Sequence, residues 1–411
     1  MSLATFFYAN ENNILALIVF AIVIAFVLWN RKKFSIEGKI LFIYRTKLGL
    51  KIMQRLSKYK RIINVYAIIG VIAAVASIGF MLYLLIPYLN LMMSHPSSTP
   101  AALDLVLPVS GVPGIVGVPI FYWLIALIVV VALHEGSHGI VALSKKIKLK
   151  ASGFGFFLAF LPLAFVEPNE KQFEKASRFD RLKVLSAGSF TNIILGILFL
   201  VIYLLLSNYI VAIHAVSFAP LALQVISVVP NSPAANASLP VNATITQING
   251  QQFSTVLQAE SKLSVIPGRY INLTTSSGVV YDIKTTYNAS INTTNHSYIG
   301  IYAGFIATEP AQFLISPISQ NAYPNNNATS QTLYWFDGLF LWIAIISLGL
   351  GLANFLPIFY ITDGCKIVNE LLGYTIKDKK LLWNATNGVI IFFSVFFLFL
   401  TPLGTLLFSH L

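Results

Sequence analysis

The sequence predicts a polytopic α-helical membrane protein with about six transmembrane helices and one mostly β domain outside the membrane. Three observations predict this fold class. Hydrophobic residues make up 56% of the 411 residues and charged residues only 10%, whereas soluble domains carry roughly a quarter. Six apolar runs approach or exceed the roughly 20 residues that a spanning helix needs. A long polar insert separates the fourth run from the fifth.

The six apolar runs define the membrane part. No basic residue precedes the first run, so we expect no cleavable signal peptide. The single cysteine, Cys365, excludes an intrachain disulfide. We expect spanning helices near Ile14–Trp29, Ile62–Leu89, Val116–Leu143, Val184–Leu206, Leu333–Tyr360 and Val389–Phe408.

Lysine and arginine residues predict the orientation of these helices. Segments 31–61, 145–183 and 366–380 hold 11, nine and four of them, and the other three lie in the polar insert. Basic loops mark the cytoplasmic side, so both termini and the insert are expected outside a cell membrane. The net charge of +12 is then an orientation signal with attraction to anionic lipid headgroups. We therefore expect membrane lipid, and no nucleic acid, among the partners.

The polar insert, about 220–331, has the composition of a small β domain. It alternates apolar and polar residues in short runs, such as "ATITQING" from Ala243 to Gly250, between Pro and Gly turn signals. Clustered N-x-S/T acceptors support an outer-surface location, and this combination suits an archaeal plasma membrane. The acceptors are Asn236, Asn242, Asn272, Asn288, Asn292, Asn295 and Asn327.

"HEGSH", residues 134–138, places ionisable side chains inside the third apolar run, where each must be compensated. On a helix, His134 and His138 are one turn apart and can hold one zinc ion. Glu135 is then placed to take a proton from water whose pKa the zinc lowers. The pattern predicts a hydrolytic zinc site.

A hydrolytic zinc site usually has three protein ligands and an open position. By the predicted topology the other four histidines map to the outer side, whereas the site lies toward the inner end of the third run. The fifth run also ends on the inner side, in "NFLPIFYITDG", residues 354–364. Pro357 breaks that helix and Gly364 allows a tight turn. We expect Asp363 to be the third ligand, with Cys365 as the less favoured alternative.

These paired motifs resemble the site-2 proteases, a family of zinc-dependent intramembrane metalloproteases. The resemblance implies that His134, His138 and Asp363 bind zinc and that Glu135 is catalytic. It also implies that Asn354 contacts substrate or stabilises the oxyanion. "SAGSFTN", residues 186–192, resembles a third family motif and makes Asn192 a second candidate for a catalytic polar contact.

The resemblance also implies two further structural features. Residues 153–168 resemble a membrane re-entrant β-hairpin, whose free edge is suited to holding an unwound substrate segment as an added strand. The insert resembles a PDZ-like domain, from "VISVVPNSPAANASLPVNATITQINGQ" at residues 225–251, and we expect it to filter substrates by size. The predicted domains are the first two helices (1–115), the catalytic core (116–210), the PDZ-like domain (220–331) and the C-terminal core (332–411).

The sequence therefore predicts an intramembrane zinc metalloprotease. It would cleave single-span membrane proteins, such as tethered regulators or signal-peptide remnants, toward the cytoplasmic side. Two alternatives remain open: a non-catalytic receptor or scaffold with a structural metal, and a zinc transporter. Glu135 favours the enzyme, because a proton-accepting base beside the ligands serves neither alternative.

Overall fold

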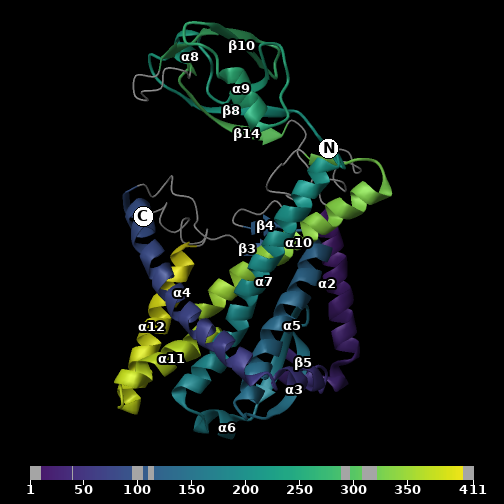
Figure 1. The fold of residues 1–411 in the computed structure, drawn as a ribbon, viewed down its shortest axis with the longest axis vertical. Helices are drawn as coiled ribbons and strands as arrows, with labels where there is room; N and C mark the ends of the chain where they lie inside the picture. The colour runs from purple at the N-terminus through teal and green to yellow at the C-terminus, as the bar shows by residue number, and fades with distance from the viewer. Residues whose placement is uncertain are drawn as a thin grey trace. The chain divides into compact units, whose positions relative to one another are not determined.

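The computed structural model describes residues 11–38, 40–94, 105–109, 115–287, 297–307 and 322–400. Six helices in this part of the chain are long and apolar enough to cross a membrane, as predicted (Figure 1). Large apolar side chains such as Ile22, Ile62 and Ile72 are exposed on them, which suits contact with lipid. The six are α2 (Glu11–Trp29), α4 (Lys60–Ser94), α5 (Ile120–Ser144), α7 (Arg178–Ala212), α10 (Ala328–Phe355) and α12 (Lys379–Leu400).

Most helix boundaries differ from the prediction by a few residues, and two of the differences have a clear local cause. Helix α10 ends at Phe355 rather than Tyr360, because Pro357 cannot continue the helical hydrogen bonds. Helix α12 begins ten residues before the predicted Val389, and the carboxylate of Asp378 accepts a hydrogen bond from the backbone N–H of Leu381 at this end (2.7 Å). The predicted end of the last span, at Phe408, lies outside the described residues.

The chain divides into two compact units, and both boundaries fall within helices α7 and α10. The first unit consists of Met1–Ile202 and Leu339–Leu411, and it contains the HEGSH motif and Asp363. The second unit is Tyr203–Gly338, and the predicted insert lies within it.

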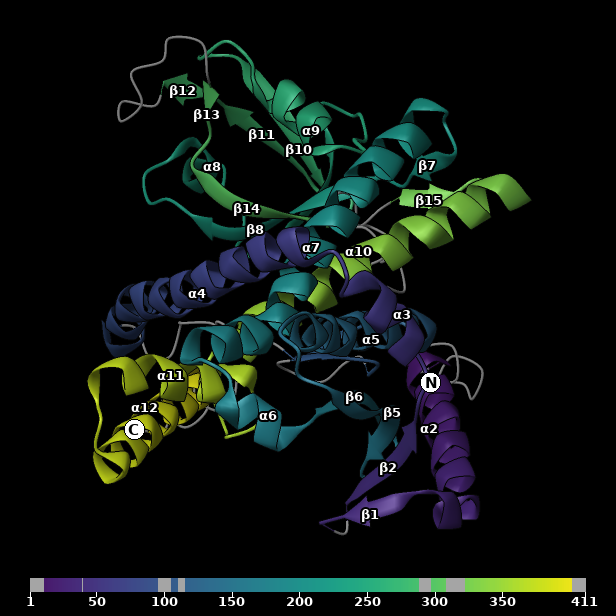
Figure 2. The same cartoon turned by 60° about the horizontal axis from the view of Figure 1, so that its bottom comes forward.

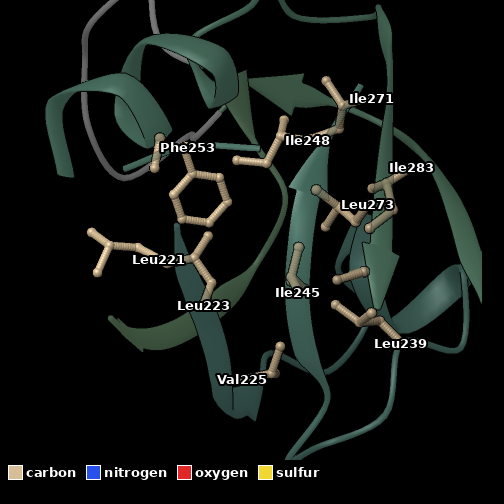
Figure 3. Packing of buried hydrophobic residues seen from close by; sticks show 12 residues of the cluster. Leu221, Leu223, Val225, Leu239, Ile245, Ile248, Phe253, Ile271, Leu273 and Ile283 are labelled. Carbon is tan, nitrogen blue, oxygen red and sulfur yellow. The ribbon is translucent and has the colours of Figure 1, made fainter. Parts of the chain in front are cut away.

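The second unit is built on a five-stranded antiparallel sheet in the order β11-β10-β9-β8-β14. Alternate residues of its strands, such as Leu221, Leu223 and Val225, point into one core with Phe253 (Figure 3). The main strands are β8 (Leu221–Val228), β9 (Thr244–Ile248), β10 (Tyr270–Thr275), β11 (Val280–Lys284) and β14 (Ile301–Ala307). Smaller elements are β7 (Val216–Phe218), α8 (Pro233–Asn236), α9 (Val256–Leu263), β12 (Thr286–Tyr287), β13 (Ser297–Tyr298) and β15 (Ala322–Pro324).

The first unit carries a four-stranded antiparallel sheet in the order β1-β2-β5-β6 (Figure 2). Strands β5 (Leu149–Phe157) and β6 (Leu161–Pro168) form an antiparallel hairpin that includes the predicted residues 153–168, while its entry into the membrane stays a prediction. Strands β1 (Ser35–Glu37) and β2 (Leu41–Thr46) extend it, although we assigned their segment only to a basic loop. Strand β6 is an edge of this sheet.

Two contacts fix helix α5 within the first unit. The side chain of Asn12 in α2 accepts a hydrogen bond from the N–H of Ile120 at the start of α5 (3.0 Å). At the other end, α3 lies against Gly139, where an added Cβ would overlap the sulfur of Met53. The remaining elements of the unit are η1 (Arg31–Lys33), α3 (Leu50–Leu56), β3 (Leu105–Leu107), β4 (Ile115–Gly117), α6 (Glu170–Lys175) and α11 (Asp363–Thr375).

Candidate metal centre

Helix α5 presents the two histidines of HEGSH on one face. Their spacing of four residues places both imidazoles on the same side of the helix. The Nε2 atoms of His134 and His138 are 3.1 Å apart, and His134 is only 6% exposed. Two imidazole nitrogens thus converge on one point inside the first unit.

Asp363 reaches the same point from the other end of the sequence. It is the first residue of α11, directly after the turn that Pro357 imposes at the end of α10. The hydroxyl of Thr362 donates to the carbonyl of Leu356 (2.5 Å) and so fixes this turn. The Oδ2 atom of Asp363 lies 3.1 Å from Nε2 of His138 and 3.3 Å from Nε2 of His134.

The three donor atoms fit a tetrahedral metal ion. Zinc binds imidazole nitrogen and carboxylate oxygen at about 2.0–2.2 Å, so its donors lie roughly 3.3 Å apart in tetrahedral geometry. The observed separations are 3.1, 3.1 and 3.3 Å. In the described part of the chain these three residues form a group that could hold a metal, and Cys365 is not in it. The thiol of Cys365 instead faces the carbonyl of Ile358 (3.6 Å).

The charge state of Asp363 suits a ligand. Burial raises the pKa of its carboxyl, but positive charge on the facing histidines, in their protonated metal-free form, outweighs burial and holds this pKa below its usual range. The carboxylate is therefore ionised at neutral pH, which is the form that binds a cation.

Helix α7 lies directly against the two histidine donors. A Cβ at Gly188 would overlap the Nε2 atoms of both histidines, so only glycine leaves room for a metal there. The hydroxyl of Tyr66 in α4 bonds the carbonyl of Ala187 (2.8 Å) and holds this part of α7 in place. The backbone of α7 therefore forms one side of the candidate site.

Helix α7 also contacts the far side of each imidazole ring. The carbonyl of Val184 lies 2.6 Å from Nδ1 of His138, so this nitrogen carries the proton and Nε2 is free for a metal. The side-chain amide of Asn192 lies 3.0 Å from Nδ1 of His134. We did not predict the contact of Val184, because the sequence gives no signal for a backbone carbonyl.

Glu135 contacts strand β6, whereas the two histidines of the same motif face Asp363. Its Oε2 atom accepts a hydrogen bond from the backbone N–H of Val166 on β6 (3.1 Å). The residue also lines a cavity of about 970 Å³, with mostly apolar walls from α2, α3, α4, α5 and the β5–β6 hairpin. The contact with the edge strand, and the part of α3 in the wall, were not expected.

Asn354 stands apart from these contacts. It lies in the last turn of α10 and is partly exposed, and no hydrogen bond of its amide to another described residue is found. The structure thus brings His134, His138, Asp363 and Asn192 together, and it leaves the predicted role of Asn354 as a prediction.

Three features define the class of protein: an H-E-x-x-H helix, a carboxylate that is far away in sequence but adjacent to this helix in space, and six apolar helices. Together they indicate a multi-pass membrane protein with a metalloprotease-type site. The sequence model of Peptidase family M50 matches residues 122–401. The chain therefore belongs to family M50, the site-2 protease family, as its motifs predicted. A protein of Methanocaldococcus jannaschii, described only as uncharacterized, is 33% identical over 190 residues. That match covers 45% of this chain and 50% of the relative.

Proposed function

We propose that this protein is an intramembrane zinc metalloprotease that hydrolyses peptide bonds in the transmembrane segments of single-span proteins. The observation that carries the proposal is the convergence of His134, His138 and Asp363, with Glu135 next to a ligand on the same helix. A structural site would be closed by a fourth protein ligand, and none is found among the described residues. One zinc ion would be held by these three side chains.

The edge of strand β6 supports a route for substrate binding. Side-chain and hydrogen-bond directions alternate along a strand, so the N–H groups on the same edge as Val166 belong to every second residue. Pro162 and Pro168 occupy two of these positions and have no N–H, which leaves Ala164 and Val166 as donors. A substrate strand would therefore add beside this short window, next to Glu135.

This edge also connects substrate binding to the base. A transmembrane helix hides its carbonyls in internal hydrogen bonds, so the substrate segment must unwind before cleavage. A carbonyl of the unwound substrate segment would accept the hydrogen bond from the N–H of Val166 in place of Glu135. The carboxylate of Glu135 would then be released. Binding of substrate and freeing of the base would then occur together.

The residues would share the hydrolysis as follows. The metal, when bound, supplies Lewis-acid activation of water and of the scissile carbonyl. Glu135 accepts the proton of the attacking water and returns it to the leaving amine. The amide of Asn354 is the candidate for stabilising the oxyanion, since the amide of Asn192 is fully buried behind His134. Glu135 lines a cavity with mostly apolar walls, which would accommodate an apolar substrate segment beside the base.

A cleavage assay in proteoliposomes tests the proposal. Wild-type protein is incubated with single-span substrates, including small proteins of its own membrane, and products are mapped by mass spectrometry. Glu135→Gln is expected to keep its zinc and lose about 10²- to 10⁴-fold in rate. Glu174→Gln, an exposed glutamate on α6, is the matched control and should cleave normally. Wild-type protein that binds zinc but cleaves none of these substrates would contradict the proposal and favour a structural metal.

A further inference from the structure

We propose that Asn192 is a positioning residue that fixes the tautomer of His134, with its side-chain oxygen accepting the Nδ1 proton of that ring. The inference rests on the proposed metal site. It assigns Asn192 a role different from the substrate contact that the sequence motif led us to expect.

The first observation is the direction of the His134 ring. Its Nε2 atom faces His138 and Asp363, so Nε2 is the atom that would bind a metal. A ligating nitrogen must present a lone pair, and the proton of a neutral imidazole must then reside on Nδ1. The protonated Nδ1 needs an acceptor, because it is buried with the rest of the ring.

Asn192 is the group beside that nitrogen. Its side-chain nitrogen lies 3.0 Å from Nδ1 of His134, while its side-chain oxygen is buried without a hydrogen-bond partner. Rotation of the amide by 180° exchanges the two atoms, and the oxygen then accepts from Nδ1 at the same distance. The residue is 0% exposed, so a substrate has no access to it.

The backbone around Asn192 keeps the amide in place. The hydroxyl of Ser347 in α10 donates to the carbonyl of Asn192 (2.8 Å). Gly351, one turn further along α10, lies so close that an added Cβ would be 3.1 Å from the Cβ of Asn192. Helix α7 thus supplies an acceptor to each histidine ligand, Val184 to His138 and Asn192 to His134.

Zinc affinity, measured by competition with a chelator, tests the inference without any activity assay. Outer hydrogen bonds to metal-ligating histidines typically change metal affinity by about 10- to 100-fold. Asn192→Leu should weaken zinc binding by this amount. Asn192→Asp should keep or strengthen it, because a carboxylate retains the acceptor. Asn208→Leu, an exposed change on the same helix, is the control and should bind zinc normally.

A double-mutant cycle separates positioning from a general packing effect. In the His134→Ala background, Asn192→Leu should cause no further loss of zinc affinity, because the ring that Asn192 orients is gone. Equal losses in both backgrounds, or an Asn192→Asp form as weak as Asn192→Leu, would overturn the inference. If the affinities follow this pattern but wild-type protein cleaves nothing, the protease proposal fails and the positioning role stands.

Discussion

Gly188→Ala is the substitution for which the structure predicts the largest effect from the smallest change. Its Cβ would lie 2.5 Å from Nε2 of His134 and closer still to Nε2 of His138. Ordinary contacts of this kind begin near 3.4 Å, so the ligands or α7 must move by about 1 Å. Metal sites tolerate deviations of about 0.2 Å, and we therefore expect zinc affinity to fall by more than 100-fold.

The assay is zinc affinity by chelator competition, together with thermal unfolding of the metal-free form. Gly349→Ala on α10 makes the same chemical change where nothing lies within 4 Å, and it should bind zinc normally. The metal-free Gly188→Ala protein should remain folded, because the clash is confined to the site. Zinc affinity equal to wild type would refute the inference that α7 backbone forms one side of the metal site.

Three further predictions concern the edge strand, α11 and the metal itself. Val166→Pro removes the N–H group that donates a hydrogen bond to Glu135, but it leaves the hydrogen bonds between β5 and β6 intact. The cleavage rate should therefore fall at least tenfold, with zinc affinity unchanged. The control variant Val166→Ala should cleave normally. Glu370→Ala breaks the partly buried pair with Arg181 (2.7 Å) that links α11 to α7. Denaturant unfolding should show a loss of about 1.5–3 kcal/mol, with weaker zinc binding through Asp363. An unchanged midpoint would contradict this. With free zinc at 100 times the Kd of the site, the bound metal should raise the free energy of unfolding by about 2.7 kcal/mol, and calorimetry should show this loss when zinc is removed. Asp363→Ala should abolish most of this difference.

The three residues of the candidate metal group could be predicted because a sequence pattern marks each of them. Two histidines four residues apart must share a helix face, and the sequence placed them in an apolar helix where charge is costly. Pro357 and Gly364 indicated a turn before α11, and Asp363 lies there. The predicted end of α10 was wrong, since hydropathy continues past the proline to Tyr360.

The contacts around the ligands were not predictable from the sequence. Val184 and Asn192 contact the histidines only because α7 is rotated to face α5, and tertiary packing sets that rotation. Strands β1 and β2 are short and lie among 11 basic residues, so their charge pattern indicated a loop. Pairing of β2 with β5 formed them, through long-range hydrogen bonds that no local pattern reveals.

X-ray absorption at the zinc edge tests the central claim most directly, because it reports the atoms bound to the metal. The account predicts two imidazole nitrogens and carboxylate or water oxygen at about 2.0–2.2 Å, with no sulfur near 2.3 Å. In Asp363→Ala the oxygen contribution should change and zinc should bind more weakly. A sulfur shell from Cys365, or an Asp363→Ala spectrum and affinity equal to wild type, would contradict a three-ligand site of His134, His138 and Asp363.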